Sequence, residues 1–206
     1  MIHNPTSHRI DPLSGELTGA TGQYSKKLSA MAGLYEDKVR FSQAIEQGGD
    51  EIVYKVSDVR PDAVHGDLIF GTTFMKPGRI GNEFFMTRGH IHAKANRPET
   101  YYGESGEGLM LLESPEGTTR VLELLPRRMI YVPPFWIHRS VNIGSVPLVL
   151  SFCYPADSGQ DYSIIDRSGG MASRIVADGS GWKEVRNSSY SPRGPLEIAR
   201  VYETGD

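Results

Sequence analysis

The chain has 206 residues, a length that suits one compact domain with short terminal additions. Its formal net charge of −3 lacks the basic surplus of a nucleic-acid-binding protein, so we expect no nucleic-acid partner. Cys153 is the only cysteine, which excludes an intrachain disulfide. The polar start of the chain and its short apolar stretches predict a cytoplasmic protein with no membrane partner.

The first 50 residues differ in composition from the rest of the chain. Residues 1 to about 23 are polar and rich in Gly, Pro, Ser and Thr, which predicts an arm or a loop. Within 24–47, Phe41, Ala44 and Ile45 form an i, i+3, i+4 apolar stripe, and Gly48 and Gly49 follow as a stop signal. We therefore expect residues 1–50 to form an arm and a short helical segment that pack on the main domain.

From residue 51, short runs of β-branched, aromatic and leucine residues alternate with turn residues. The predicted strands are 52–59, 66–75, 83–87, 100–103, 109–113, 120–124, 129–132, 139–143, 148–154 and 174–177. Short strands at this spacing, without alternating helices, are typical of a β-barrel or a sandwich. The predicted fold class is therefore all-β, with the barrel over 51–186. The polar tail at 187–206 is expected to be loosely ordered or to pack on a partner subunit.

A pair of histidines is the first candidate for chemistry. On a strand, the side chains of His90 and His92 would leave the same face about 7 Å apart, so that both imidazoles could reach one ion. A bare His-x-His pair is more often simply part of a polar strand face. Glu99 lies at an odd offset from His92, but Pro98 favours a chain break that could return its carboxylate to the two imidazoles.

A third imidazole completes the set. His138 follows the stiff Pro133-Pro134 corner at the end of a predicted strand. Three imidazoles and one carboxylate form a mixed nitrogen and oxygen ligand set that suits Fe²⁺, Mn²⁺, Ni²⁺, Zn²⁺ or Cu²⁺. Such a set leaves coordination positions for adjacent oxygens of a substrate.

This pattern resembles the cupins, which carry His-x-His, a nearby Glu and a later His. It departs from them in the long gap to Glu99 and in Phe135, which stands where a glycine is usual. A narrower resemblance, to the cupin-type, archaeal-style glucose-6-phosphate isomerases, resolves both departures. The positions that carry it are Thr73, Pro77, Gly78, Gly81, Glu83, Thr87, Gly89, His90, His92, Glu99 and Tyr101, then Tyr131, Val132, Pro133, Pro134, Trp136, His138 and Arg139, and then Tyr154, Pro155, Ala156, Asp157, Gly159, Asp161 and Tyr162.

The resemblance implies a double-stranded β-helix, or jelly-roll barrel, that forms a homodimer. It also implies one divalent metal ion per subunit, with Fe²⁺ favoured, and reversible conversion of glucose 6-phosphate to fructose 6-phosphate. The implied metal ligands are His90, His92, Glu99 and His138, and the implied catalytic residues are Glu99 and Tyr154. The implied substrate-binding residues are Thr73, Thr87, Gly89, Tyr101, Gln160 and Tyr162.

Alternatives remain open at this point. An iron-dependent cupin dioxygenase and a non-catalytic sugar-binding cupin could use the same four ligands. The motif positions ahead of His90 favour the isomerase, because neither alternative needs them. Hydrogen transfer could use Glu99 as a base or proceed as a hydride shift, since a neighbouring cation lowers the pKa of a carboxyl group and weakens it as a base.

Further motif positions have two interpretations each. Gln160 stands where the family commonly has a histidine, and glutamine can form hydrogen bonds but cannot titrate. Glu83 is either an ordinary strand or turn carboxylate or a functional one. Arg88 and Arg139 are candidates to supply positive charge to a substrate phosphate.

Overall fold

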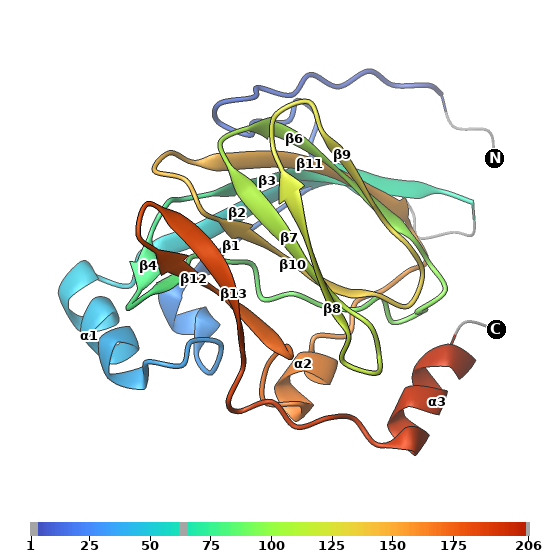
Figure 1. Cartoon of the computed structure of the whole chain (residues 1–206). Coiled ribbons are helices and arrows are strands. Elements are labelled where there is room, and N and C mark those ends of the chain that lie inside the picture. The colour runs from blue at the N-terminus through green and yellow to red at the C-terminus, as the bar shows by residue number, and fades with distance from the viewer. Residues whose placement is uncertain (1–3, 62–65, 205–206) are drawn as a thin grey trace.

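The computed structural model describes residues 4–61 and 66–204 and has two facing antiparallel sheets with a third beside them (Figure 1). The largest sheet has the order β1-β2-β3-β11-β6-β9, with bounds Gly22–Lys27, Ile52–Val59, Leu68–Met75, Leu148–Pro155, Glu99–Ser105 and Met129–Val132. The facing sheet has the order β10-β7-β8, with bounds Ile137–Asn142, Gly108–Glu113 and Thr119–Leu124. The third has the order β13-β12-β5-β4, with bounds Gly181–Arg186, Ser173–Asp178, Glu83–Phe84 and Arg79–Ile80.

The main core lies between the two facing sheets. Met75 and Leu150 from the large sheet and Met110 and Leu112 from β7 belong to one buried apolar cluster. The opposite face of β7 is also covered, because Leu111 packs in a second cluster with residues of the C-terminal helices. These observations confirm the expected all-β class, and they explain why every residue of β7 is buried.

The predicted helical segment is only partly correct. The helices are η1 (Leu28–Met31), α1 (Lys38–Gly48), α2 (Ser163–Arg167) and α3 (Pro195–Glu203). Helix α1 starts where the Asp37 side chain accepts from the Arg40 amide, and it ends at Gly49 with a φ of 70°. The prediction was wrong for 24–27, which belong to strand β1 and pair with β2. Hydrogen bonding to the edge of the sheet outweighs the helix propensity of this polar segment.

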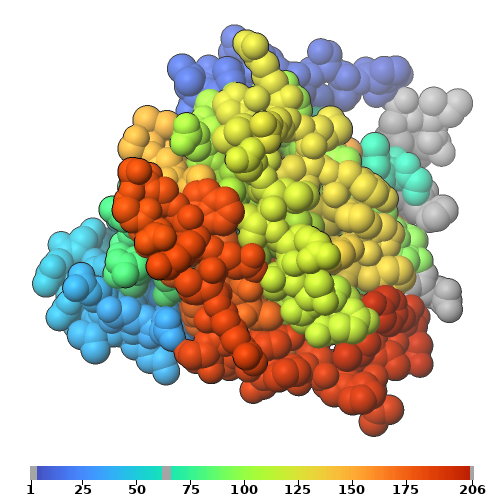
Figure 2. All heavy atoms as spheres, viewed as in Figure 1, coloured from blue at the N-terminus to red at the C-terminus, as the bar shows by residue number. Residues whose placement is uncertain are grey.

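The C-terminal segment packs on its own barrel, so the expectation of a loosely ordered tail was wrong, and the alternative of packing on a partner subunit stays a prediction. The side chains of Arg193 and Glu113 form a fully buried ion pair with 2.6 Å between Nη1 and Oε1. Val201 of α3 joins the second apolar cluster with Leu111 and Ile164. Figure 2 shows this segment, in red, against the yellow-green surface of β7 and β8. Within the described part of the chain, no helix combines the length and apolar character needed to cross a membrane.

Candidate metal centre and substrate pocket

The backbone around His90 brings the histidines together. His90 and His138 form a two-residue bridge, in which each amide donates to the other's carbonyl at 3.1 and 2.9 Å. Their imidazole ring centroids are therefore 4.5 Å apart. Gly89 allows this close approach, because it has a φ of 76° and a Cβ there would press on the His138 carbonyl and the Arg139 side chain.

Glu99 reaches the histidines because the chain turns before it. The Arg97 amide donates to the Lys94 carbonyl at 3.0 Å, and β6 then begins at Glu99. From Glu99 Oε2, the distance is 2.9 Å to His138 Nε2, 3.3 Å to His92 Nε2 and 3.8 Å to His90 Nε2. The four side chains that the sequence singled out thus converge on one point.

The hydrogen bonds around the cluster leave ring nitrogens available for a metal ion. His92 Nδ1 lies 2.7 Å from the Arg97 carbonyl and His138 Nδ1 lies 3.0 Å from the Trp136 carbonyl. Donation to these carbonyls favours the tautomer whose Nε2 lone pair faces Glu99. The buried Nε2 atoms of His90 and His92 have no hydrogen-bond partner among the described residues. Unpartnered buried nitrogens beside a carboxylate fit a divalent cation.

The four proposed ligands are not equally close to one another. Ligand atoms of His90, Glu99 and His138 all lie within 4.8 Å of one another, as donors around a single ion must. His92 is not part of that tightest set, although it belongs to the same cluster through Glu99. Three of the four expected ligands therefore form the compact core of the site, with His92 at its margin.

Burial and hydrogen bonding set the charge of the cluster. Burial, reinforced by the nearby His138, holds the pKa of His90 well below its ordinary value. Burial alone would raise the pKa of Glu99, but the close imidazoles of His138 and His92 outweigh it and hold that pKa well below its usual range. At neutral pH, His90 is neutral and Glu99 is ionised, which are the forms that bind a divalent cation.

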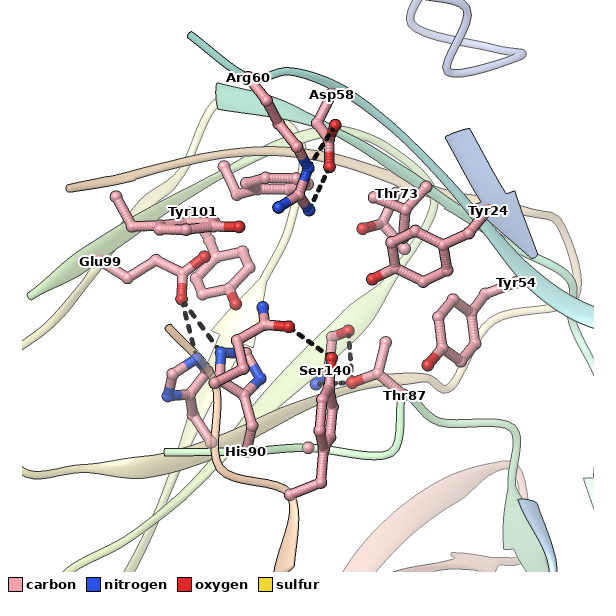
Figure 3. A pocket seen from close by; sticks show the side chains of 17 residues that line it. Tyr24, Tyr54, Asp58, Arg60, Thr73, Thr87, His90, Glu99, Tyr101 and Ser140 are labelled. Atoms are coloured by element: carbon pink, nitrogen blue, oxygen red, sulfur yellow. Dashed lines mark hydrogen bonds and ion pairs between the residues drawn. The ribbon is translucent and has the colours of Figure 1, made fainter. Parts of the chain in front are cut away.

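The cluster forms one wall of a pocket of about 540 Å³, including its open mouth (Figure 3). The predicted pocket residues all line it: Thr73, Thr87, Gly89, Tyr101, Tyr154, Gln160 and Tyr162. His92 is absent from the lining and supports the cluster from behind.

The pocket tyrosines are hydrogen-bond donors at neutral pH. Burial raises the pKa of Tyr154 to about 12, and the negative charge of Glu99 contributes to the increase. Burial also raises the pKa values of Tyr101 and Tyr162. Tyr162 donates to Gln160 Oε1 at 2.5 Å, so the amide of Gln160 is held against the pocket wall.

The two arginines that the sequence offered as phosphate-binding candidates lie outside the pocket lining. Arg88 donates to the Ala30 carbonyl at 2.9 Å and pairs with Asp166. Arg139 is buried and donates to the Arg88 carbonyl at 2.5 Å. Neither side chain lines the pocket, so neither is placed to contact a substrate phosphate as the sequence had suggested.

Glu83 has a structural environment. Its carboxylate forms a buried ion pair with Arg174 at 2.6 Å and accepts from the Glu36 amide at 2.7 Å. Of the two interpretations left open by the sequence, these contacts support the ordinary one. Glu83 ties β5 to β12 and to the segment before α1.

Sequence reasoning missed several residues of the pocket. The polar ones are Tyr24, Tyr54, Asp58, Arg60 and Ser140, and the apolar ones are Val56 and Phe152. The alternation of Tyr54, Val56 and Asp58 along β2 was an available signal, because side chains two apart share a face and an aspartate in an otherwise apolar row is unusual. Tyr24 could not be found in this way, since its segment was expected to be helical.

Comparisons with known proteins show the family of the chain. The protein family described as "Glucose-6-phosphate isomerase (GPI)" matches residues 25–193. The chain is 54% identical over 202 residues to the glucose-6-phosphate isomerase of Sinorhizobium medicae (strain WSM419), covering 98% of this chain and 94% of that protein. It is 42% identical over 163 residues to the glucose-6-phosphate isomerase of Thermococcus litoralis, covering 79% and 84%.

Among solved structures, an oxalate oxidase in complex with the substrate analogue glycolate is similar over 53% of this chain and 55% of that chain, at 14% identity and a TM-score of 0.45. The family match and the two isomerases extend over much more of the chain. From these matches, the chain belongs to the glucose-6-phosphate isomerase family, in its cupin-type form.

Proposed function

We propose that this chain interconverts glucose 6-phosphate and fructose 6-phosphate with one divalent metal ion per subunit. The observation that carries the proposal is the buried convergence of three imidazoles on Glu99 at the wall of a polar pocket. The proposed ligands are His90, His92, Glu99 and His138. The relatives that are themselves named glucose-6-phosphate isomerases support the choice of substrate.

The reaction moves a hydrogen between C1 and C2 and develops negative charge on the two neighbouring oxygens. A divalent ion held by the four side chains would stabilise that charge as a Lewis acid. We propose Fe²⁺ as the ion, and the same ligand set also suits Mn²⁺, Ni²⁺ and Zn²⁺.

Glu99 is the proposed base. It is ionised and borders the pocket, so it can accept the proton from one carbon and return it to the other. Its low pKa makes it a weak base, and a positioned base of this kind contributes about 10²–10⁴-fold to a rate. Turnover in D₂O distinguishes the two routes: proton transfer through Glu99 places deuterium in the product, whereas a hydride shift leaves the product unlabelled.

Neutral groups are proposed to bind and orient the substrate. The protonated hydroxyl of Tyr154 is placed to donate to a substrate oxygen near Glu99 and to steady the developing charge. The Thr73 and Thr87 hydroxyls and the Gly89 amide offer donors to the sugar phosphate. Tyr101, Gln160 and Tyr162 complete the polar lining.

We further propose that the enzyme is a cytoplasmic homodimer, as the family resemblance implies. Strand β9 exposes two large side chains, those of Met129 and Tyr131, which could lie in such an interface. Light scattering on the purified protein tests this assembly directly, and a monomer at micromolar concentration would contradict it.

A coupled assay with fructose 6-phosphate tests the proposed reaction. We expect production of glucose 6-phosphate, with metal bound to the active protein by elemental analysis. Oxygen uptake without isomerisation would instead indicate the dioxygenase. A metal-loaded protein that binds sugar phosphates without turnover would indicate the non-catalytic cupin.

A further inference from the structure

Arg60 reaches the pocket from the chain that follows β2. Figure 3 shows its guanidinium pointing into the pocket from the side opposite His90. Among the lysines and arginines of residues 4–61 and 66–204, it is the one that lines this pocket. Its side chain is 46% exposed, so a ligand in the pocket can contact it.

Asp58 fixes the orientation of Arg60. Arg60 donates from Nε to Asp58 Oδ1 at 2.9 Å and from Nη2 to Asp58 Oδ2 at 2.7 Å. Asp58 itself is only 1% exposed, so its carboxylate lies behind the guanidinium. Gly22 of the neighbouring strand makes room for it, because a Cβ at that position would collide with the Asp58 carboxylate. A two-point ion pair of this kind orders the arginine before a ligand binds.

The pairing leaves donors of the guanidinium available. Within the described ranges, no residue accepts a hydrogen bond from Arg60 Nη1. The positive charge also acts on the pocket wall. Burial raises the pKa values of Tyr154 and Tyr162, and in both cases Arg60 is the largest influence in the opposite direction. An ordered cation with free N–H groups therefore faces the same space as these tyrosines.

We infer that Arg60 selects phosphorylated sugars by donating hydrogen bonds from its free N–H groups to the substrate phosphate. The inference rests on the proposed function, in which the reacting C1 and C2 atoms lie at the metal cluster. A hexose 6-phosphate carries its phosphate at the other end of the carbon chain, so the recognising cation belongs on the opposite side of the pocket. Threonine and tyrosine hydroxyls can bind phosphate oxygens, but they do not provide the charge that separates a phosphate from a hydroxymethyl group.

Arg60→Gln tests the inference, because it removes the charge and keeps a polar side chain of moderate size. We expect KM for fructose 6-phosphate to rise about 10- to 100-fold, the range expected for loss of a charge-assisted hydrogen bond. The kcat value and the metal content should change little, since Arg60 is distant from C1 and C2. The inhibition constant of inorganic phosphate should rise in parallel.

Matched variants separate this role from folding. The double variant Asp58→Asn/Arg60→Gln avoids leaving a buried carboxylate unpaired and should show the same rise in KM. Arg128→Gln, which removes an exposed arginine paired with Glu123, should leave KM unchanged. An unchanged KM and an unchanged phosphate inhibition constant in both Arg60 variants would overturn the inference.

The experiment also distinguishes this inference from the proposed function. If the wild-type enzyme fails to turn over fructose 6-phosphate, the proposed function fails. The inference is then decided by the dissociation constant of inorganic phosphate, measured by calorimetry. A larger dissociation constant for phosphate in Arg60→Gln than in the wild type supports the inference. Equal dissociation constants in the two proteins contradict it.

Discussion

Glu99 is surrounded at close range by three imidazoles, of which those of His92 and His138 are almost completely buried and that of His90 is 12% exposed. Burial makes an uncompensated charge or an unpaired nitrogen costly, so such a cluster persists only if something satisfies it. A divalent cation satisfies every member at once. The electrostatic contribution of each ligand can be tested by a single substitution.

The first prediction concerns the charge of Glu99. Glu99→Gln keeps the size and the hydrogen-bonding capacity of the side chain but removes the anionic ligand and the proposed base. We expect bound metal to decrease and turnover to fall by at least about 100-fold. Elemental analysis and the coupled assay measure the two effects. Glu123→Gln on the exposed surface is the control, and a near-normal rate in Glu99→Gln would show that the assignment is wrong.

The second prediction concerns Gln160, which cannot titrate. Gln160→His introduces an imidazole with an unperturbed pKa of about 6.5 into the pocket. Its positive form attracts a phosphate, so the ratio of variant to wild-type kcat/KM should increase as pH falls from 8 to 6. Titration of the substrate phosphate cancels in this ratio. A ratio that is flat across this range would mean that position 160 does not sense the substrate charge.

At the scale of elements, the C-terminal segment is attached to β7 through a charged contact. Arg193 and Glu113 have no solvent-exposed side-chain surface, and Glu113 also accepts from the Ala172 amide at 2.6 Å. One carboxylate therefore joins β7, the start of the β12 hairpin and the segment before α3. Removal of its cation leaves an uncompensated charge in the interior.

The third prediction follows from this ion pair. Arg193→Met should lower the free energy of unfolding by about 3–5 kcal/mol, because Glu113 remains buried without its partner. Urea denaturation measures the change. Glu113→Gln/Arg193→Met should recover part of the loss. Arg128→Met removes an exposed ion pair and should cost less than about 1 kcal/mol. Equal losses in the two single variants would refute the structural role of the buried pair.

Some of these elements could be predicted from the sequence and others could not. Short runs of β-branched and aromatic residues predicted strands 52–59 and 129–132 with the bounds of β2 and β9, and Pro98 correctly indicated the break before Glu99. Strand β1 was not recognisable, because its polar residues pair at a sheet edge that only the folded chain provides. The Arg60–Asp58 pair escaped for a related reason: it depends on Gly22 of β1, which is distant in sequence.

At the scale of the whole molecule, the metal cluster joins separate parts of the fold. His90 and His92 lie before the turn at 94–97, Glu99 begins β6 and His138 belongs to β10. These segments meet only in the folded barrel, so an ion that binds all of them stabilises the folded state over the unfolded state.

The fourth prediction is a linkage between metal and thermal stability. Addition of Fe²⁺ or Mn²⁺ to chelator-treated protein should raise Tm, by an amount equivalent to about 2.7 kcal/mol when free metal is 100 times its Kd. Differential scanning calorimetry under anaerobic conditions measures the shift. In His138→Gln, which lacks one ligand, most of the shift should disappear. An identical shift in that variant would place the bound metal elsewhere.

In the proposed mechanism each chain needs one metal ion for turnover, which a metal titration can measure. Chelator-treated enzyme is titrated with Fe²⁺, and isomerisation of fructose 6-phosphate is followed together with bound metal. We predict no turnover at the start and a linear increase that reaches its plateau at about one ion per chain. Full turnover in protein shown by elemental analysis to be metal-free would show that the ion is not required.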